Sequence, residues 1–149
     1  MHIAGHIPVW FYKDEEGEYQ VRAKKKLLER SEGALKRKGR LIVFPEGQLS
    51  RDGSLGPFKF GFFKIAKKTG SPIIPVAMWG NHTIFPPGDV VAAARPGRVE
   101  IIFGDPVNPE DFETLKDMRD HVHKVISDLQ KTLPSYPSQM EQRQIASTA

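Results

Sequence analysis

The residues best suited to chemistry in this sequence are one carboxylate and three cations that follow a short apolar run. The carboxylate is Glu46, beside Gly47, and the cations after it are Arg51, Lys59 and Lys64. Ammonium and guanidinium groups form charge-assisted hydrogen bonds to phosphate and carboxylate groups, so this cluster suits an anionic substrate. The alternative is a strand followed by an ordinary solvated turn, which the same residue types also fit.

The element that must position Glu46 is the segment Leu41–Phe44. Its apolar, β-branched and aromatic residues are typical of a buried strand. Pro45 should end that strand, because proline has no N–H for a sheet ladder, and Gly47 permits a sharp turn. Open α/β sheets bind ligands at the carboxyl ends of their strands. We therefore expect Glu46 to lie at the carboxyl end of this strand, beside a ligand site.

Several short blocks around this segment occur in the order found in one family. Phe44–Gly47 reads F-P-E-G, and Gly5–Val9 precedes it, whereas Phe58–Gly61 and Ile73–Val76 follow. Together the blocks resemble the glycerolipid acyltransferases, and most of all those that act on 1-acyl-sn-glycerol-3-phosphate. The resemblance covers roughly Ile3 to Pro109.

The resemblance implies a fold, a reaction and a site. The fold class would be α/β, with a mixed, mostly parallel sheet and flanking helices. The reaction would serve phospholipid biosynthesis, since such enzymes move an acyl group from acyl-CoA or acyl-carrier protein to lysophosphatidic acid and so make phosphatidic acid. No cofactor beyond the acyl donor, and no metal, is implied. The residues expected to bind the acceptor are Phe44, Pro45, Glu46, Gly47, Arg51, Lys59 and Gly61.

The sequence departs from the family pattern beside F-P-E-G. Members usually continue with Thr-Arg-Ser, whereas Gln48, Leu49 and Ser50 follow here. Leu49 therefore stands where the family has an arginine. Two alternatives stay open for Arg51, two positions later: it takes over the role of that arginine, or it has no such role. At the end of the first block, Trp10 and Phe11 stand where the family has another arginine, and Lys13 is the nearest cation.

A larger departure concerns the family's catalytic pair, a histidine with an aspartate five residues later, upstream of F-P-E-G. His2 and His6 have Ile7 and Phe11 at that position. The chain's one such pair is His123 and Asp128, in a predicted helix where side chains five apart point about 140° apart. We expect His123 to have no role at the site and this chain to be inactive on its own.

Residues 1–133 are accordingly interpreted as the C-terminal two-thirds of an acyltransferase domain, incomplete at its N-terminus. A truncated gene, an alternative start or a degenerate copy would each account for this. Residues 134–149 are polar and rich in small residues, which predicts a disordered tail.

Composition sets the outer limits. The 149 residues are enough for one core, and the lack of cysteine excludes disulfides, Cys-based metal sites and a thiol nucleophile. No apolar run has the roughly 18 residues of a transmembrane helix, and no leader is recognised. The net charge of +4 suits an anionic membrane surface, to which we expect peripheral binding. Nucleic-acid binding is not expected, because no known motif accompanies the basic residues.

Periodicity predicts the other elements. Helices are expected at Arg22–Lys38 with Gly39 as its cap, at Gly61–Lys68, and from Asn108 to Pro134; strands are expected at His6–Tyr12, Tyr19–Val21, Ser71–Met78 and Arg98–Gly104. The lysine-rich face of the first helix is either a solvated surface or a membrane-binding one. His82, in a predicted loop, is either a neighbour of the ligand or a bystander.

Overall fold

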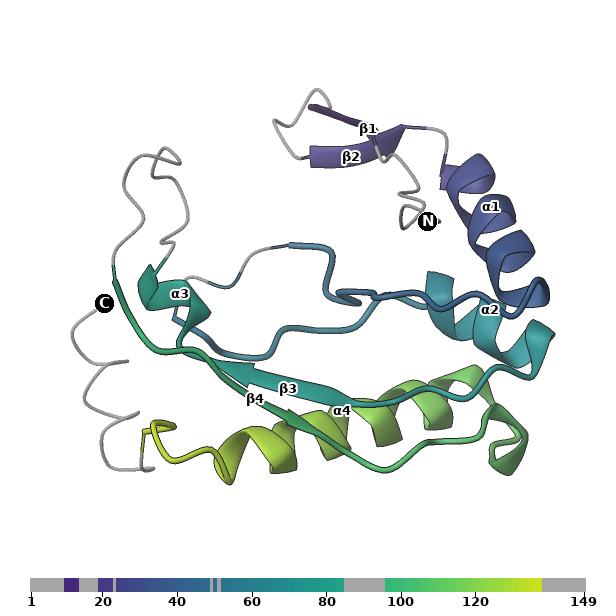
Figure 1. The fold of residues 1–149 in the computed structure, drawn as a ribbon. Helices are drawn as coiled ribbons and strands as arrows, with labels where there is room; N and C mark the ends of the chain where they lie inside the picture. The colour runs from purple at the N-terminus through teal and green to yellow at the C-terminus, as the bar shows by residue number, and fades with distance from the viewer. Residues whose placement is uncertain are drawn as a thin grey trace, which may run out of the picture.

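The structure, a computed structural model, describes residues 10–13, 19–22, 24–48, 50, 52–84 and 96–137. Figure 1 shows the order of its elements. They are β1 (Trp10–Lys13), β2 (Tyr19–Arg22), α1 (Lys24–Lys36), α2 (Gly61–Thr69), β3 (Val76–Trp79), α3 (Asn81–Ile84), β4 (Glu100–Phe103), the 3-10 helix η2 (Pro109–Asp111) and α4 (Leu115–Lys131). The Gly5–Val9 block, Leu49 and Arg51 lie outside the described residues.

The described strands form two antiparallel pairs. β1 pairs with β2, and β3 pairs with β4 in a register that places Val76 opposite Phe103. The β3–β4 ladder is interrupted at Pro75, which has no N–H, and resumes as an isolated bridge between Ile73 and Val107. The family resemblance implied an α/β fold with a mostly parallel sheet. Among the described residues no two strands pair in parallel, so that part of the expectation is not confirmed.

The segment Leu41–Phe44 is not a strand, contrary to the prediction from its composition. Ile42 is 93% exposed and Phe44 68% exposed, so this apolar run is not covered as a central strand would be. β-Branched and aromatic residues favour an extended, half-buried backbone, but a strand also needs a neighbour to complete its ladder. No described segment pairs with this one.

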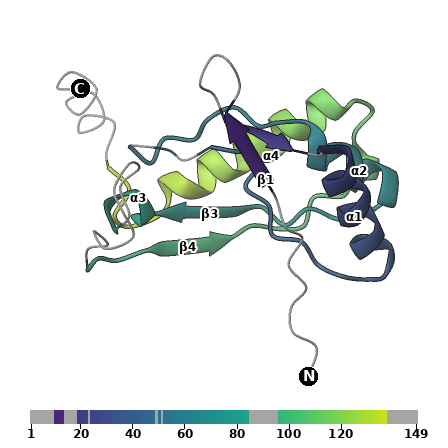
Figure 2. The same ribbon diagram turned by 90° about the horizontal axis from the view of Figure 1, so that it is seen from above.

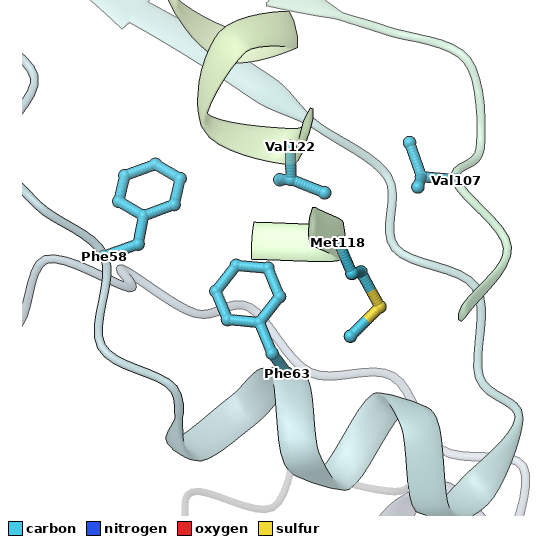
Figure 3. Close-up of a cluster of buried hydrophobic side chains, with 5 residues drawn as sticks. All are labelled: Phe58, Phe63, Val107, Met118 and Val122. Carbon is cyan, nitrogen blue, oxygen red and sulfur yellow. The ribbon is translucent and has the colours of Figure 1, made fainter. Parts of the chain in front are cut away.

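The core forms where α4 and α2 meet the loop that carries Phe58. Figure 3 shows the buried cluster of Phe58, Phe63, Val107, Met118 and Val122. Met118 and Val122 come from α4 and are 0% and 2% exposed. In Figures 1 and 2, α4 runs along the β3–β4 pair, so one helix supports both the strands and the loop.

The first two predicted helices are confirmed, with one correction at a cap. α2 matches its predicted span to within one residue, whereas α1 is two residues shorter than predicted at each end, and Gly70 ends α2 in the left-handed conformation. After α1, however, the left-handed residue is Lys38 (φ 59°) rather than Gly39. Gly39 is needed for a close approach, because a Cβ there would lie 2.8 Å from the Ala34 carbonyl oxygen.

The last helix begins later than Asn108. Pro109–Asp111 makes one 3-10 turn, the backbone extends at Phe112, and α4 starts after Thr114. The Thr114 hydroxyl accepts a hydrogen bond from the Asp117 N–H (3.1 Å), whereas Asn108 makes no side-chain cap. Both residues carry an N-cap signature, and the one that captures a helical N–H sets the boundary.

The segment predicted as a tail begins with residues that make contacts. Ser135 donates from its N–H and its hydroxyl to one oxygen of Glu100, at 2.9 and 2.6 Å. These hydrogen bonds lower the pKa of the Glu100 carboxyl, and Arg98 adds to the effect. Tyr136 packs edge-on against Trp79. Residues 138–149 lie outside the described part of the chain.

Candidate functional site

The F-P-E-G residues form a closed turn. The Gly47 N–H donates to the Phe44 carbonyl oxygen at 3.2 Å, and Gly47 has φ +67°, a left-handed conformation that favours glycine. A second backbone bond fixes the turn against a later segment, because the Lys59 N–H donates to the Pro45 carbonyl oxygen at 2.9 Å. The two predicted site segments, 44–47 and 58–61, therefore lie against each other.

The Lys59 side chain extends over this turn. A Cβ added at Gly47 would lie 3.0 Å from Lys59 Nζ and 3.3 Å from its Cδ and Cε. The absence of a side chain at Gly47 therefore leaves room for the Lys59 side chain. Lys59 is exposed, and no carboxylate among the described residues pairs with its ammonium group. The site thus presents a cation, unneutralised by the described part of the protein, beside a tight turn.

Glu46 uses one carboxylate oxygen within the protein. Its Oε2 accepts a hydrogen bond from the Gly56 N–H at 2.7 Å, in a partly buried position. A Cβ at Gly56 would lie 2.9 Å from that oxygen, so glycine is required for this approach. Glu46 therefore ties the turn to the 53–58 loop, whatever else its second oxygen contacts.

Between these segments lies a polar turn centred on Asp52. Its Oδ1 accepts hydrogen bonds from the Ser54 hydroxyl (2.6 Å), the Ser54 N–H (2.9 Å) and the Ser50 hydroxyl (3.1 Å). These bonds, with the Ser54 hydroxyl foremost, lower the pKa of Asp52 to about 2. Asp52 is therefore ionised at neutral pH and holds the loop closed.

His82 packs beside the same loop. Its ring lies 4.7 Å from that of Trp79, and a Cβ at Gly53 would lie 2.7 Å from its Nδ1. Nδ1 is buried and has no hydrogen-bond partner among the described residues. Burial lowers the pKa of His82, and the Asp52 carboxylate opposes that shift. The contacts of His82 are thus structural ones, to Trp79 and Gly53.

The other predicted residues are more dispersed. Phe44 is largely exposed at the head of the turn. Gly61 begins α2 and faces Leu28 of α1, where a Cβ would make an ordinary contact at 3.5 Å. In Figure 2, α1 lies beside α2, where Glu32 pairs with Lys68 at 2.8 Å. Arg51 lies outside the described residues, and its place in the site stays a prediction.

Two side chains of α4 contact the site, and sequence analysis did not assign them. His123 Nε2 lies 3.2 Å from the Gly56 carbonyl oxygen, and Gln130 Nε2 donates to the carbonyl oxygens of Gly53 (3.2 Å) and Met78 (3.1 Å). His123 was expected to have no role at the site, and that expectation did not anticipate its contact with Gly56. The available signal was a polar residue beside the apolar face of α4, since polar side chains that become buried form hydrogen bonds, most often to backbone or water.

Two features that could bear on function do not occur among the described residues, a membrane-spanning helix and a metal-binding cluster. No described helix is long and apolar enough to cross a membrane. No group of three histidine, aspartate or glutamate side chains is arranged to hold a metal ion within the ranges that the structure describes.

Comparison with known proteins identifies the family. The family model "Acyltransferase" matches residues 2–79, more than half of the chain. The chain is 38% identical over 63 residues to a chloroplastic 1-acyl-sn-glycerol-3-phosphate acyltransferase, BAT2, of Brassica napus, a match that covers 42% of this chain and 18% of that protein. It also matches the crystal structure of the 1-acyl-sn-glycerophosphate acyltransferase PlsC of Thermotoga maritima, with a TM-score of 0.68 and 33% identity.

These matches cover different shares of the proteins compared. The structural match covers 76% of this chain and 46% of the Thermotoga protein. The chain thus spans less than half the length of either relative. The family-model match includes the whole F-P-E-G turn and the loop that packs against it, through the end of β3. The chain belongs to the acyltransferase family.

Proposed function

We propose that this protein serves phospholipid biosynthesis as an acyltransferase of the lysophosphatidic acid type. The reaction would transfer an acyl group from acyl-CoA or acyl-carrier protein to 1-acyl-sn-glycerol-3-phosphate, giving phosphatidic acid. Family membership supports this proposal, as do the names of the two relatives, both of which act on this acceptor. The proposal assigns the F-P-E-G turn to acceptor binding.

The observation that carries this assignment is the position of Lys59. Its ammonium group lies over the Gly47 turn, is exposed, and has no carboxylate partner among the described residues. A phosphate monoester at this position would gain a charge-assisted hydrogen bond from Nζ. Gly47, without a side chain, leaves the turn backbone open to a close approach. Arg51 is proposed as a second cation for the same phosphate.

We propose further that the chain as printed binds the acceptor but transfers no acyl group on its own. Acyl transfer to a hydroxyl needs a base to take its proton, and such help is worth roughly 10²–10⁴-fold. None of the histidines before F-P-E-G in these 149 residues has an aspartate five positions later. The same observation favours an alternative, a non-catalytic acyltransferase-like protein that binds a lipid phosphate or a protein partner.

Calorimetric titration with lysophosphatidic acid, together with an assay using labelled acyl-CoA, tests these proposals. We expect measurable binding and no transfer. Lys59→Ala should weaken binding by about 1–3 kcal/mol, because a hydrogen bond to a charged group is lost. Lys124→Ala, which removes an exposed cation on α4, is the matched control and should not change the affinity.

The outcomes separate the proposals. Absence of binding by the unmodified chain would contradict acceptor binding at this turn. Turnover by the unmodified chain would contradict the proposal that the missing base makes it inactive. If a longer form that carries a His-x4-Asp pair also binds without transfer, the non-catalytic alternative is favoured.

A further inference from the structure

We propose that His123 of α4 is a positioning residue for the F-P-E-G turn. It acts through the backbone of Gly56, whose carbonyl oxygen it contacts, and Gln130 of the same helix assists it. This inference rests on the proposed function only in calling the turn an acceptor site. The contacts themselves involve no ligand. Both residues lie beyond residue 79, where the family-model match ends.

The backbone of Gly56 is held on both sides of its Cα, at its N–H and at its carbonyl oxygen. Its N–H donates to Glu46 Oε2 at 2.7 Å, and its carbonyl oxygen lies 3.2 Å from His123 Nε2. A carbonyl oxygen only accepts hydrogen bonds, so Nε2 must carry the proton. Nε2 is protonated in the neutral Nε2–H tautomer and also in the imidazolium ion.

The imidazole is itself fixed by packing. The Phe58 ring meets it edge-on with ring centres 4.8 Å apart, and Phe58 is only 5% exposed in the core cluster. The ring that donates to Gly56 is thus held by a residue two positions further along the same loop. His123 combines a packing contact with a hydrogen bond, and the two can be separated by substitution.

Gln130 provides the second attachment of the loop to α4. It is 6% exposed and donates to the carbonyl oxygens of Gly53 and Met78, so it joins the start of the loop to β3. His123 and Gln130 are seven residues apart, about two helical turns, and so lie on one face of α4. Both ends of the 53–56 stretch are therefore attached to a single helix face.

This attachment reaches both side chains that are proposed to shape the acceptor site, Glu46 in the turn and Lys59 beside it. Glu46 contacts Gly56 directly. Lys59, three residues after Gly56, bonds through its N–H to the Pro45 carbonyl oxygen and extends its side chain over Gly47. Loss of the His123 hydrogen bond should loosen Gly56, and the alignment of the Glu46–Gly47 turn with Lys59 should become less well defined.

Two substitutions separate the hydrogen bond from the packing. His123→Gln keeps an N–H donor near the position of Nε2 but loses the ring, whereas His123→Phe keeps a ring against Phe58 but loses the donor. The same two substitutions at His121, an exposed residue of α4 whose ring contacts Phe112, are the matched controls.

The first measurement is amide hydrogen exchange at Gly56 in the chain without ligand. We expect His123→Phe to raise the Gly56 exchange rate about tenfold, equivalent to about 1.4 kcal/mol, and His123→Gln to stay within about threefold of wild type. Unchanged exchange in His123→Phe would overturn the proposal. Equal acceleration in both variants would overturn it too, since packing alone would then explain the effect.

The second measurement is the affinity for lysophosphatidic acid. We expect His123→Phe to weaken binding about tenfold, His123→Gln to restore most of it, and both His121 variants to bind as wild type does. If wild type does not bind but Gly56 exchange behaves as expected, the proposed function fails and the positioning contact stands. If wild type binds and His123→Phe binds equally well, the positioning role is overturned and the proposed function stands.

Discussion

At the scale of single residues, Gly47 shows how a backbone conformation and a side chain depend on each other. The turn gives it a left-handed φ, which favours glycine, and a Cβ there would crowd the Lys59 side chain at 3.0–3.3 Å. Gly70, at the end of α2, has nearly the same φ (+63° against +67°), but a Cβ there would meet nothing within 4 Å. The two glycines therefore separate the two requirements.

Gly47→Ala should cost more than Gly70→Ala. Both substitutions carry the penalty of a left-handed alanine, roughly 1–2 kcal/mol, but only the first displaces Lys59. Denaturant unfolding should show the larger loss for Gly47→Ala, and only this variant should lose affinity for lysophosphatidic acid. Equal losses of stability with unchanged affinity would mean that the Lys59 side chain does not need its place over the turn.

His82 predicts a pH dependence of stability. Burial lowers its pKa in the folded protein, whereas the unfolded chain titrates near 6.5. Just below pH 6.5 the unfolded state therefore binds more protons than the folded state. Stability should fall as the pH drops through about 6.5, and this loss should level off below the folded pKa.

His82→Phe tests this expectation, because it keeps a ring against Trp79 and removes the titrating group. Its melting temperature should change less between pH 7.5 and pH 5.5 than that of the wild type. His121→Phe, the same substitution at an exposed histidine, is the control. Parallel pH profiles for wild type and His82→Phe would contradict a folded-state pKa lowered by burial.

At the scale of elements, α4 carries the core on one part of its surface and the loop contacts on another. Met118 and Val122 are buried against Phe58 and Phe63 (Figure 3). His123 follows directly on Val122 in the sequence. Met118→Ala should therefore reduce the free energy of unfolding by about 2–5 kcal/mol, the usual cost of truncating a buried large side chain.

Denaturant unfolding measures that loss, with Lys124→Ala as a control from the exposed side of α4. The control should stay within about 0.5 kcal/mol of wild type. A loss below about 1 kcal/mol for Met118→Ala would contradict its place at the centre of the core.

Sequence reasoning succeeded where an element is determined by its own residues. Helices α1 and α2 were predicted from their apolar stripes, and the end of α2 from its glycine. Helical periodicity and capping are local properties, so the sequence of each segment was enough. It failed for Leu41–Phe44, whose status as a strand depends on a neighbour. It also misplaced the start of α4, where two N-cap signatures compete six residues apart.

The candidate site divides in the same way. Glu46, Gly47 and Lys59 could be selected from the sequence because they fall within one short stretch that resembles a family motif. His123 and Gln130 could not, because their contacts join residues 67 and 77 positions apart. Such contacts depend on how α4 lies on the loop, and no local pattern specifies that arrangement.

At the scale of the whole molecule, much of the positive charge is concentrated in one segment of the chain, residues 24–42. Residues 24–42 contain eight cations against two carboxylates, whereas the net charge of the chain is +4. All eight cations are exposed, and Ile42, 93% exposed, follows the last of them by two residues. An exposed basic helix followed by an exposed apolar side chain fits the proposed peripheral binding to anionic membranes.

Replacing Lys24, Lys25 and Lys26 together by glutamine should weaken binding to vesicles of phosphatidylglycerol and phosphatidylcholine on the order of 100-fold, since each lysine near the surface contributes about 1 kcal/mol. The control replaces Lys116, Lys124 and Lys131 of α4 by glutamine; these lysines are also exposed, and their loss changes the net charge equally.

The apolar contribution is tested at Ile42. Ile42→Ser should weaken vesicle binding further, whereas Ile101→Ser, on β4, should not. Vesicle co-sedimentation at low and high salt measures the affinities, and high salt should weaken wild-type binding by screening the lysines. If the two lysine triples lose affinity equally, net charge alone governs the attraction and binding through α1 is contradicted. If the wild-type protein co-sediments equally well with vesicles of pure phosphatidylcholine, the electrostatic contribution is contradicted altogether.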